Sequence, residues 1–139
     1  MDTEIVTSAL ASTGIAARVL APADRESLVA RLRDRLGADV SAHAPWDDET
    51  APDGRQRPDG WELVARHVWT ESCLMFPDGA PVVWEFESGA DLHGLLRECP
   101  PFEFYVCDRA ASYLLCSNHH DFVIGWGSAQ PWLDSLGDP

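Results

Sequence analysis

The stretch that most constrains the fold covers residues 102–127. It contains three short runs rich in aromatic and aliphatic residues, FEFYVC, YLLCSN and FVIGWG, and only a few residues separate one run from the next. Short apolar runs bounded by Asp, Asn and Ser are typical of β-strands. Connections this short join antiparallel neighbours, because a parallel pair needs a much longer crossover. The sequence therefore predicts a three-stranded antiparallel meander near the C-terminus.

The first hairpin of this meander has a predicted register. A pairing of Val106 with Leu115 also pairs Tyr105 with Cys116. Side chains alternate along a strand, so one face carries Phe102, Phe104, Val106, Tyr113 and Leu115. The opposite face carries Tyr105, Cys107, Leu114 and Cys116. Because both faces are apolar, we expect this pair to lie at the centre of a sheet and to be covered on both sides.

Residues 72–87 predict a second antiparallel unit. A strand over residues 72–76 is followed by Pro-Asp-Gly-Ala, which favours a tight turn with Gly at positive φ. The next run alternates, with Val82, Trp84 and Phe86 on one side and Val83, Glu85 and Glu87 on the other. This pattern predicts a hairpin with one side on the core and an acidic, solvent-facing outer side.

Five segments show helical periodicity, namely residues 2–13, 22–36, 61–69, 88–99 and 128–136. The segment 88–99 has the clearest ends: Ser88 is a suitable cap with Asp91 three positions on, and two prolines follow the helix. Residues 15–20 are open to two interpretations, a short strand or a continuation of the first helix past Gly14.

Together these elements predict a single α+β domain over residues 1–139. We expect a small antiparallel sheet of about five strands in two hairpin or meander units. Helices should pack on one side of it, two of them from the N-terminal part of the chain. A chain of 139 residues suits one domain and can bury roughly two thirds of its unfolded surface.

Residues 41–60 are expected to form a long loop, because they contain three prolines and no periodicity. Trp46 is followed there by Asp47, Asp48 and Glu49. An aromatic side chain beside acids suits a contact with a protein partner. The alternative is that Trp46 packs back onto the domain and holds the loop in place.

The charge balance is strongly acidic. The chain has 23 acidic residues against ten arginines and no lysine, for a net charge of −13, and residues 41–139 account for −12 of it. Such a charge repels nucleic acid and anionic lipid and speeds association with basic partners. It argues against nucleic-acid binding by Arg31, Arg33 and Arg35 in the second helix. Solubility alone is the simpler explanation of the charge.

The four cysteines form no Cys-x-x-Cys pair. The N-terminal residues lack the basic and apolar regions of a signal peptide, and no window is apolar enough for a membrane span. We therefore expect reduced, buried cysteines in a cytoplasmic protein.

The turn between the last two strands carries the side chains best suited to catalysis or metal binding, those of His119, His120 and Asp121. Asn118 precedes them, and an Asn at this corner takes positive φ at low cost. Consecutive residues on a strand point to opposite sides, so one metal could bind both histidines only if the turn brought them together.

A zinc site would also need ligands such as His93, Cys73 or Cys116, which no paired spacing marks. An acid–base pair of His120 with Asp121, or of His119 with Glu103, is the enzymatic alternative. No nucleophile or glycine-rich phosphate loop accompanies it, so no cofactor is expected.

The run YLLCSNHHDFVIGWG, with the Trp-Leu pair that follows it, resembles a group of small uncharacterised bacterial proteins. They share a Leu-Leu-x-x-Asn-His-His-Asp-x-x-Ile-Gly-x-Gly pattern after an aromatic Phe-Tyr strand. Such proteins resemble the small acidic immunity proteins that neutralise toxins of bacterial competition. The resemblance covers about half of the chain, from residue 61 onward, and assigns no catalytic residue.

Two functions follow from these observations. The first is an acidic inhibitory protein that neutralises a basic bacterial toxin, a nuclease being one candidate. Its expected contacts are Trp46, Asp47, Asp48, Glu49, Glu85 and Glu87. The alternative is a small enzyme or metal-binding domain centred on His119, His120 and Asp121.

Overall fold

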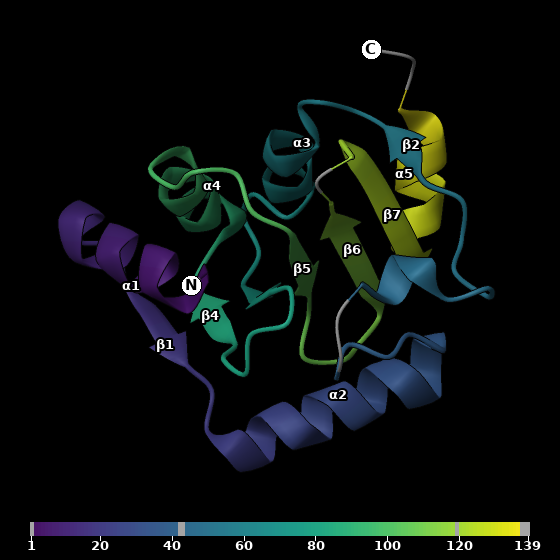
Figure 1. Ribbon diagram of the computed structural model, residues 1–139, viewed down its shortest axis with the longest axis horizontal. Helices are drawn as coiled ribbons and strands as arrows, with labels where there is room; N and C mark the ends of the chain where they lie inside the picture. The colour runs from purple at the N-terminus through teal and green to yellow at the C-terminus, as the bar shows by residue number, and fades with distance from the viewer. Residues whose placement is uncertain (1, 42–43, 119, 137–139) are drawn as a thin grey trace.

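The computed structural model describes residues 2–41, 44–118 and 120–136. Within these residues the chain forms an α+β fold with seven strands in one antiparallel sheet, in the order β1-β4-β3-β5-β6-β7-β2 (Figure 1). The strands are β1 (Ala17–Val19), β2 (Arg55–Gln56), β3 (Cys73–Pro77), β4 (Trp84–Phe86), β5 (Phe104–Cys107), β6 (Tyr113–Ser117) and β7 (Phe122–Gly127). The helices are α1 (Asp2–Thr13), α2 (Pro22–Leu36), α3 (Gly60–His67), α4 (Gly89–Arg97) and α5 (Ala129–Ser135), with a short 3-10 helix η1 (Pro45–Asp47).

The predicted meander is confirmed as β5, β6 and β7. Tyr105 pairs with Cys116 and Val106 with Leu115, as the alternation of apolar residues indicated. Phe104, Val106 and Leu115 belong to one buried cluster of side chains. Tyr105 and Cys116 belong to another cluster on the opposite face of the sheet.

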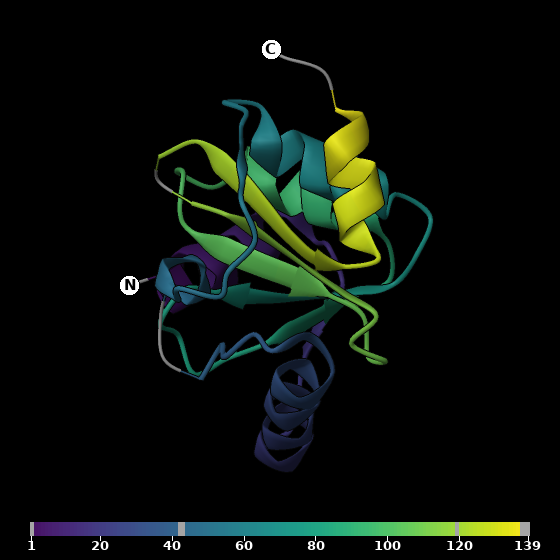
Figure 2. The same ribbon diagram turned by 90° about the vertical axis from the view of Figure 1, so that its right-hand side faces the viewer.

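The helices cover both faces of the sheet, so the prediction that they pack on one side is wrong. Side chains of α1, α3, α4 and α5 bury one face. The apolar stripe of α2, from Leu28 to Leu32, covers the other face together with Ala38 and Val40. Figure 2 shows α2 on one side of the sheet and α3 and α5 on the other. Two apolar faces of the same sheet both need cover from water, and α2 supplies it on the second face.

The count of about five strands is also corrected. β1 and β2 lie at the two edges of the sheet, where β1 pairs with β4 and β2 pairs with β7. They span three and two residues, too few to show the alternation by which a strand is recognised. The two N-terminal helices are confirmed, but Gly14 at φ 72° follows α1 and β1 lies between them. The strand interpretation of residues 15–20 is therefore the right one.

The start of α4 follows the predicted capping. The Ser88 hydroxyl accepts a hydrogen bond of 3.1 Å from the backbone N–H of Asp91. The next residue, Gly89, lies against the end of α3: a Cβ there would be 2.4 Å from the carbonyl oxygen of Ala65 and 2.5 Å from that of Val68. Glycine thus permits the close packing of α4 on α3.

The segment 41–60 is more structured than the predicted loop. Its residue Trp46 belongs to the α2 side of the sheet, β2 pairs with β7 as the outermost strand, and α3 then packs on the opposite side. Residues 44–60 therefore pass around the β2 edge of the sheet (Figure 2).

Candidate functional site

The expected acidic contacts at positions 47–49 belong to a longer run of acids between residues 39 and 53. Its described carboxylates, all exposed, are Asp39, Asp47, Asp48, Glu49 and Asp53. The sequence holds no arginine from residue 36 to residue 54. We call these five residues the acidic segment.

Trp46 anchors this segment to the sheet. Its indole packs edge-on against the ring of Tyr105, with ring centroids 5.9 Å apart, and Pro45 beside it is buried. The hydroxyl of Tyr105 donates a hydrogen bond to the Asp78 carboxylate. The same carboxylate accepts a bond of 2.8 Å from the backbone N–H of Ala44. The packing of Trp46 onto the domain is thus the interpretation that the structure supports.

Local hydrogen bonds favour the ionised form of two acids in the segment. The backbone N–H and hydroxyl of Thr50 donate to Asp48, at 2.8 and 2.7 Å, and lower the pKa of that carboxyl. The hydroxyl and N–H of Ser41 likewise lower the pKa of Asp39. The charge of Arg33 also lowers the pKa of Asp39, while the charge of Asp48 raises it by a smaller amount.

Glu85 and Glu87 occupy different environments, and the predicted acidic outer side of their hairpin is wrong. Val83, on the same side as Glu85, is buried in the α2-side cluster. The side chain of Glu85 is only 13% exposed. Glu87 lies beyond the end of β4 and is exposed.

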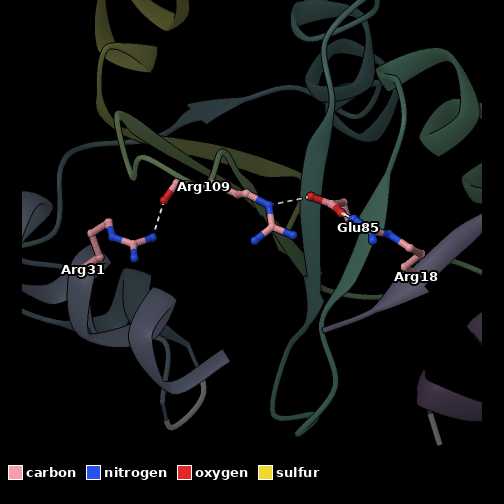
Figure 3. Close-up of polar contacts among 4 residues, drawn as sticks. All are labelled: Arg18, Arg31, Glu85 and Arg109. Carbon is pink, nitrogen blue, oxygen red and sulfur yellow. Dashed lines mark hydrogen bonds and ion pairs between the residues drawn. The ribbon is translucent and has the colours of Figure 1, made fainter. Parts of the chain in front are cut away.

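Two arginines bind the Glu85 carboxylate from opposite sides (Figure 3). Arg109 donates from Nε to Oε2 at 2.7 Å, and Arg18 donates from Nη2 to Oε1. The hydrogen bond from Arg109 is the main reason that the pKa of Glu85 lies below its usual value. We call Arg18, Glu85 and Arg109 the Glu85 clasp, because it joins β1 and β4 to the turn between β5 and β6.

Two arginines of α2 continue this connection. Arg31 donates to the backbone carbonyl of Arg109, and Arg35 donates to that of Ala110 at 2.9 Å. Their guanidinium groups therefore fasten α2 to the β5–β6 turn (Figure 3 shows Arg31). Arg31 and Arg35, two of the three arginines considered for nucleic-acid binding, therefore have a structural role.

The His-His-Asp turn is only partly within the described chain, because His119 lies outside it. The Asn118 side chain accepts hydrogen bonds from the backbone N–H groups of His120 and Phe122, at 3.0 and 3.1 Å. Asp121, rather than Asn118, takes the left-handed conformation, at φ 62°.

The additional ligands that a zinc site would need lie apart from one another. Cys73 and Cys116 are buried in the clusters on opposite faces of the sheet. His93 packs against two indoles, 5.5 Å from Trp61 and 5.3 Å from Trp69 between ring centroids. Among the residues that the structure describes, no three His, Cys, Asp or Glu side chains are placed to hold one metal ion.

A pocket of about 600 Å³ lies beside this turn. Its lining comes from α3, the end of α4, the connection from α4 to β5, and the β6–β7 turn, and includes Trp61, Arg97, Cys99, Phe102 and Asp121. Sequence reasoning missed the pocket because its walls come from segments far apart in the chain. The only indication of the pocket in the sequence was that aromatic residues and prolines lie near the ends of predicted helices and strands.

Comparisons with protein families, with curated proteins and with solved structures found no match to this chain. Among the described helices, none has both the length and the apolar character needed to cross a membrane. The four cysteines are free thiols, and Cys73, Cys107 and Cys116 are buried.

Proposed function

We propose that this protein is an acidic inhibitory protein that binds and neutralises a basic bacterial toxin, and that the acidic segment is its main contact surface. The observation that carries the proposal is that five exposed carboxylates share a segment without arginine. The resemblance of residues 113–127 to proteins of immunity type supports the same class. Four free thiols suit the reducing cytoplasm in which such an inhibitor would act.

The anchoring of the acidic segment supports a binding role. Trp46 and the hydrogen bond from Ala44 to Asp78 hold the start of η1 on the sheet. A surface that is ordered before binding loses less conformational entropy on association than a mobile one. Exposed charges of one sign also raise the association rate with an oppositely charged partner, which is the main kinetic advantage of an acidic inhibitor.

The proposed contact surface contains fewer of the acidic residues than the sequence predicts. Glu85 is bound by Arg18 and Arg109, so we leave it out of the proposed surface. Glu87 stays a prediction, as an exposed carboxyl away from the acidic segment. Trp46 contributes chiefly by holding Asp47, Asp48 and Glu49 in place.

The experiment mixes the purified protein with each basic toxin candidate encoded beside its gene, and measures binding and toxin activity. Binding with loss of toxin activity is the expected result. The absence of both would overturn the proposed function.

A triple variant, Asp47→Asn/Asp48→Asn/Glu49→Gln, then tests the surface. Its association rate at low salt should fall by about tenfold or more, because steering depends on these charges. The matched control is Glu4→Gln/Glu71→Gln/Asp134→Asn, which removes three exposed acids of α1, the α3–β3 connection and α5, away from both the acidic segment and the pocket. An equal loss in the control would mean that total charge, and not the acidic segment, determines binding.

A further inference from the structure

The pocket beside the β6–β7 turn is lined in part by aromatic rings and prolines. Trp61 is stacked on His93 with an angle of 14° between the ring planes. Phe102 packs against Phe104, whose ring is buried, at 5.6 Å. Pro58, Pro100 and Pro101 complete the apolar part of the lining. Walls of this kind suit a flat group, since aromatic faces attract guanidinium ions as well as other rings.

Asp121 places a carboxylate in the lining of this pocket. Its backbone is fixed on both sides, because its N–H donates to the carbonyl of Asn118 at 3.2 Å and its carbonyl accepts from the N–H of Arg57 at 2.7 Å. The residue is exposed. An exposed carboxylate at an aromatic wall can accept a bidentate guanidinium.

Two arginines, Arg57 and Arg97, and a second carboxyl, that of Glu103, also line the pocket. The guanidinium of Arg57 donates to both carboxylate oxygens of Asp59, at 3.1 and 3.2 Å. Arg97 is exposed in the last turn of α4, next to the exposed Glu98. The chain as a whole carries a net charge of −13, so the long-range field draws cations toward the pocket and repels anions.

We propose that this pocket receives an arginine side chain of the basic partner, an inference that rests on the proposed function. The aliphatic part of the arginine lies along Phe102 and the prolines. Its guanidinium stacks on an aromatic wall and pairs with Asp121. A volume of about 600 Å³ leaves room for the neighbouring residues of a partner loop. The pocket then supplies an anchor, while the acidic segment supplies electrostatic attraction.

Cys99 offers a direct measure of occupancy, because it lines the pocket and is half-buried. The other three thiols are 0–1% exposed and should not react in the folded protein. The pKa of Cys99 is raised by burial and by Glu98, so a maleimide reagent at mildly alkaline pH suits the assay. Loss of labelling in Cys99→Ala identifies the reacting thiol.

The probe is N-acetyl-arginine amide, and the matched control is N-acetyl-citrulline amide, which has the same shape without the charge. At a probe concentration of twice its dissociation constant, two thirds of the pockets are filled, so labelling of Cys99 should slow about threefold. Equal protection by citrulline amide, or no protection by either compound, would overturn the inference. Stronger protection by N-acetyl-glutamate amide would also overturn it, since the pocket would then be an anion site of its arginines.

The variant Asp121→Asn tests the pairing, because Asn also accepts the left-handed conformation at φ 62°. It should weaken arginine amide by roughly threefold to tenfold, as expected for loss of a charge-assisted pair. Asp24→Asn, an exposed carboxyl on α2, should leave binding of the probe unchanged. An undiminished affinity in Asp121→Asn would refute the role of this carboxylate.

The two proposals fail in different ways. If a toxin binds but arginine amide does not protect Cys99, the pocket inference is wrong and the proposed function stands. If arginine amide protects Cys99 but no basic partner is bound or inhibited, the proposed function is wrong and the pocket is a cation site of another kind.

Discussion

Replacing Glu85 by Gln should destabilise the protein at neutral pH and have little effect in acid. The variant keeps the size of the side chain and removes the charge that Arg18 and Arg109 bind. The two arginines are 78% and 55% exposed, so solvent screens each pair and each contributes at most about 1 kcal/mol. Shielding of the Glu85 carboxylate, which is 13% exposed, strengthens both hydrogen bonds. We therefore expect a loss of about 1–2 kcal/mol in the free energy of unfolding, or roughly 5 °C in Tm for a chain of this size.

The pH dependence of this loss identifies its cause. The folded-state pKa of Glu85 is lowered, chiefly by the hydrogen bond from Arg109. A lowered pKa contributes stability that is fully present above the unfolded value, about 4.3 for Glu. That stability disappears as the pH falls through the folded-state pKa. The difference in stability between the wild type and Glu85→Gln should therefore be constant near pH 7 and shrink below about pH 4.

Urea unfolding followed by tryptophan fluorescence, at a series of pH values, measures this difference. Glu87→Gln is the matched control, because Glu87 is exposed two residues away and should change stability by less than about 0.5 kcal/mol. A loss for Glu85→Gln that is the same at pH 7 and pH 3.5, or that Glu87→Gln reproduces, would refute the assignment to the Glu85 clasp.

Two further predictions concern local structure. Ser88→Ala removes the side-chain cap of α4 and should lower the free energy of unfolding by about 1 kcal/mol, measured by thermal unfolding. The control is Ser128→Ala, at a helix start where the side chain makes no cap bond, and it should cost much less. Equal losses in the two variants would contradict the capping role. Trp46→Ala should cost roughly 1–2 kcal/mol, less than a fully buried Trp, and should speed hydrogen exchange at residues 44–51. Trp69→Ala, at a side chain that is 42% exposed, is its control, and unchanged exchange in Trp46→Ala would show that the indole does not hold the segment.

The centre of the sheet was predictable because its strands consist mainly of side chains that favour burial away from water. Strands β5 and β6 are apolar on both faces, and only one register places Val106 opposite Leu115. This pattern predicted that both faces of the sheet are covered. The prediction that all helices pack on one side was inconsistent with it and is the one that the structure corrects. An amphipathic helix such as α2 shows which of its own faces is buried but not which face of the sheet it meets.

The edges and the pocket depended on contacts that local sequence does not contain. Arg55 and Gln56 form β2 only because the outer edge of β7 offers them hydrogen-bonding partners. The pocket needs α3 and the end of α4 to meet the β6–β7 turn. Each segment is ordinary by itself, so the concave surface that they form together has no signature in any of them.

The fold also decides which acids are available to a partner, and this changes how the charge should be interpreted. From sequence, Glu85 and Asp48 are equivalent contributions to the same negative total. In the structure, Glu85 binds two arginines and joins β1 and β4 to the β5–β6 turn. The Asp48 carboxylate instead accepts hydrogen bonds from the N–H and hydroxyl of Thr50. A carboxylate bound by arginines contributes little to the field felt by an approaching cation, while one stabilised by N–H and O–H groups keeps its full charge at the surface. The steering power of this protein should therefore follow the exposed acids of residues 39–53 more closely than its net charge of −13.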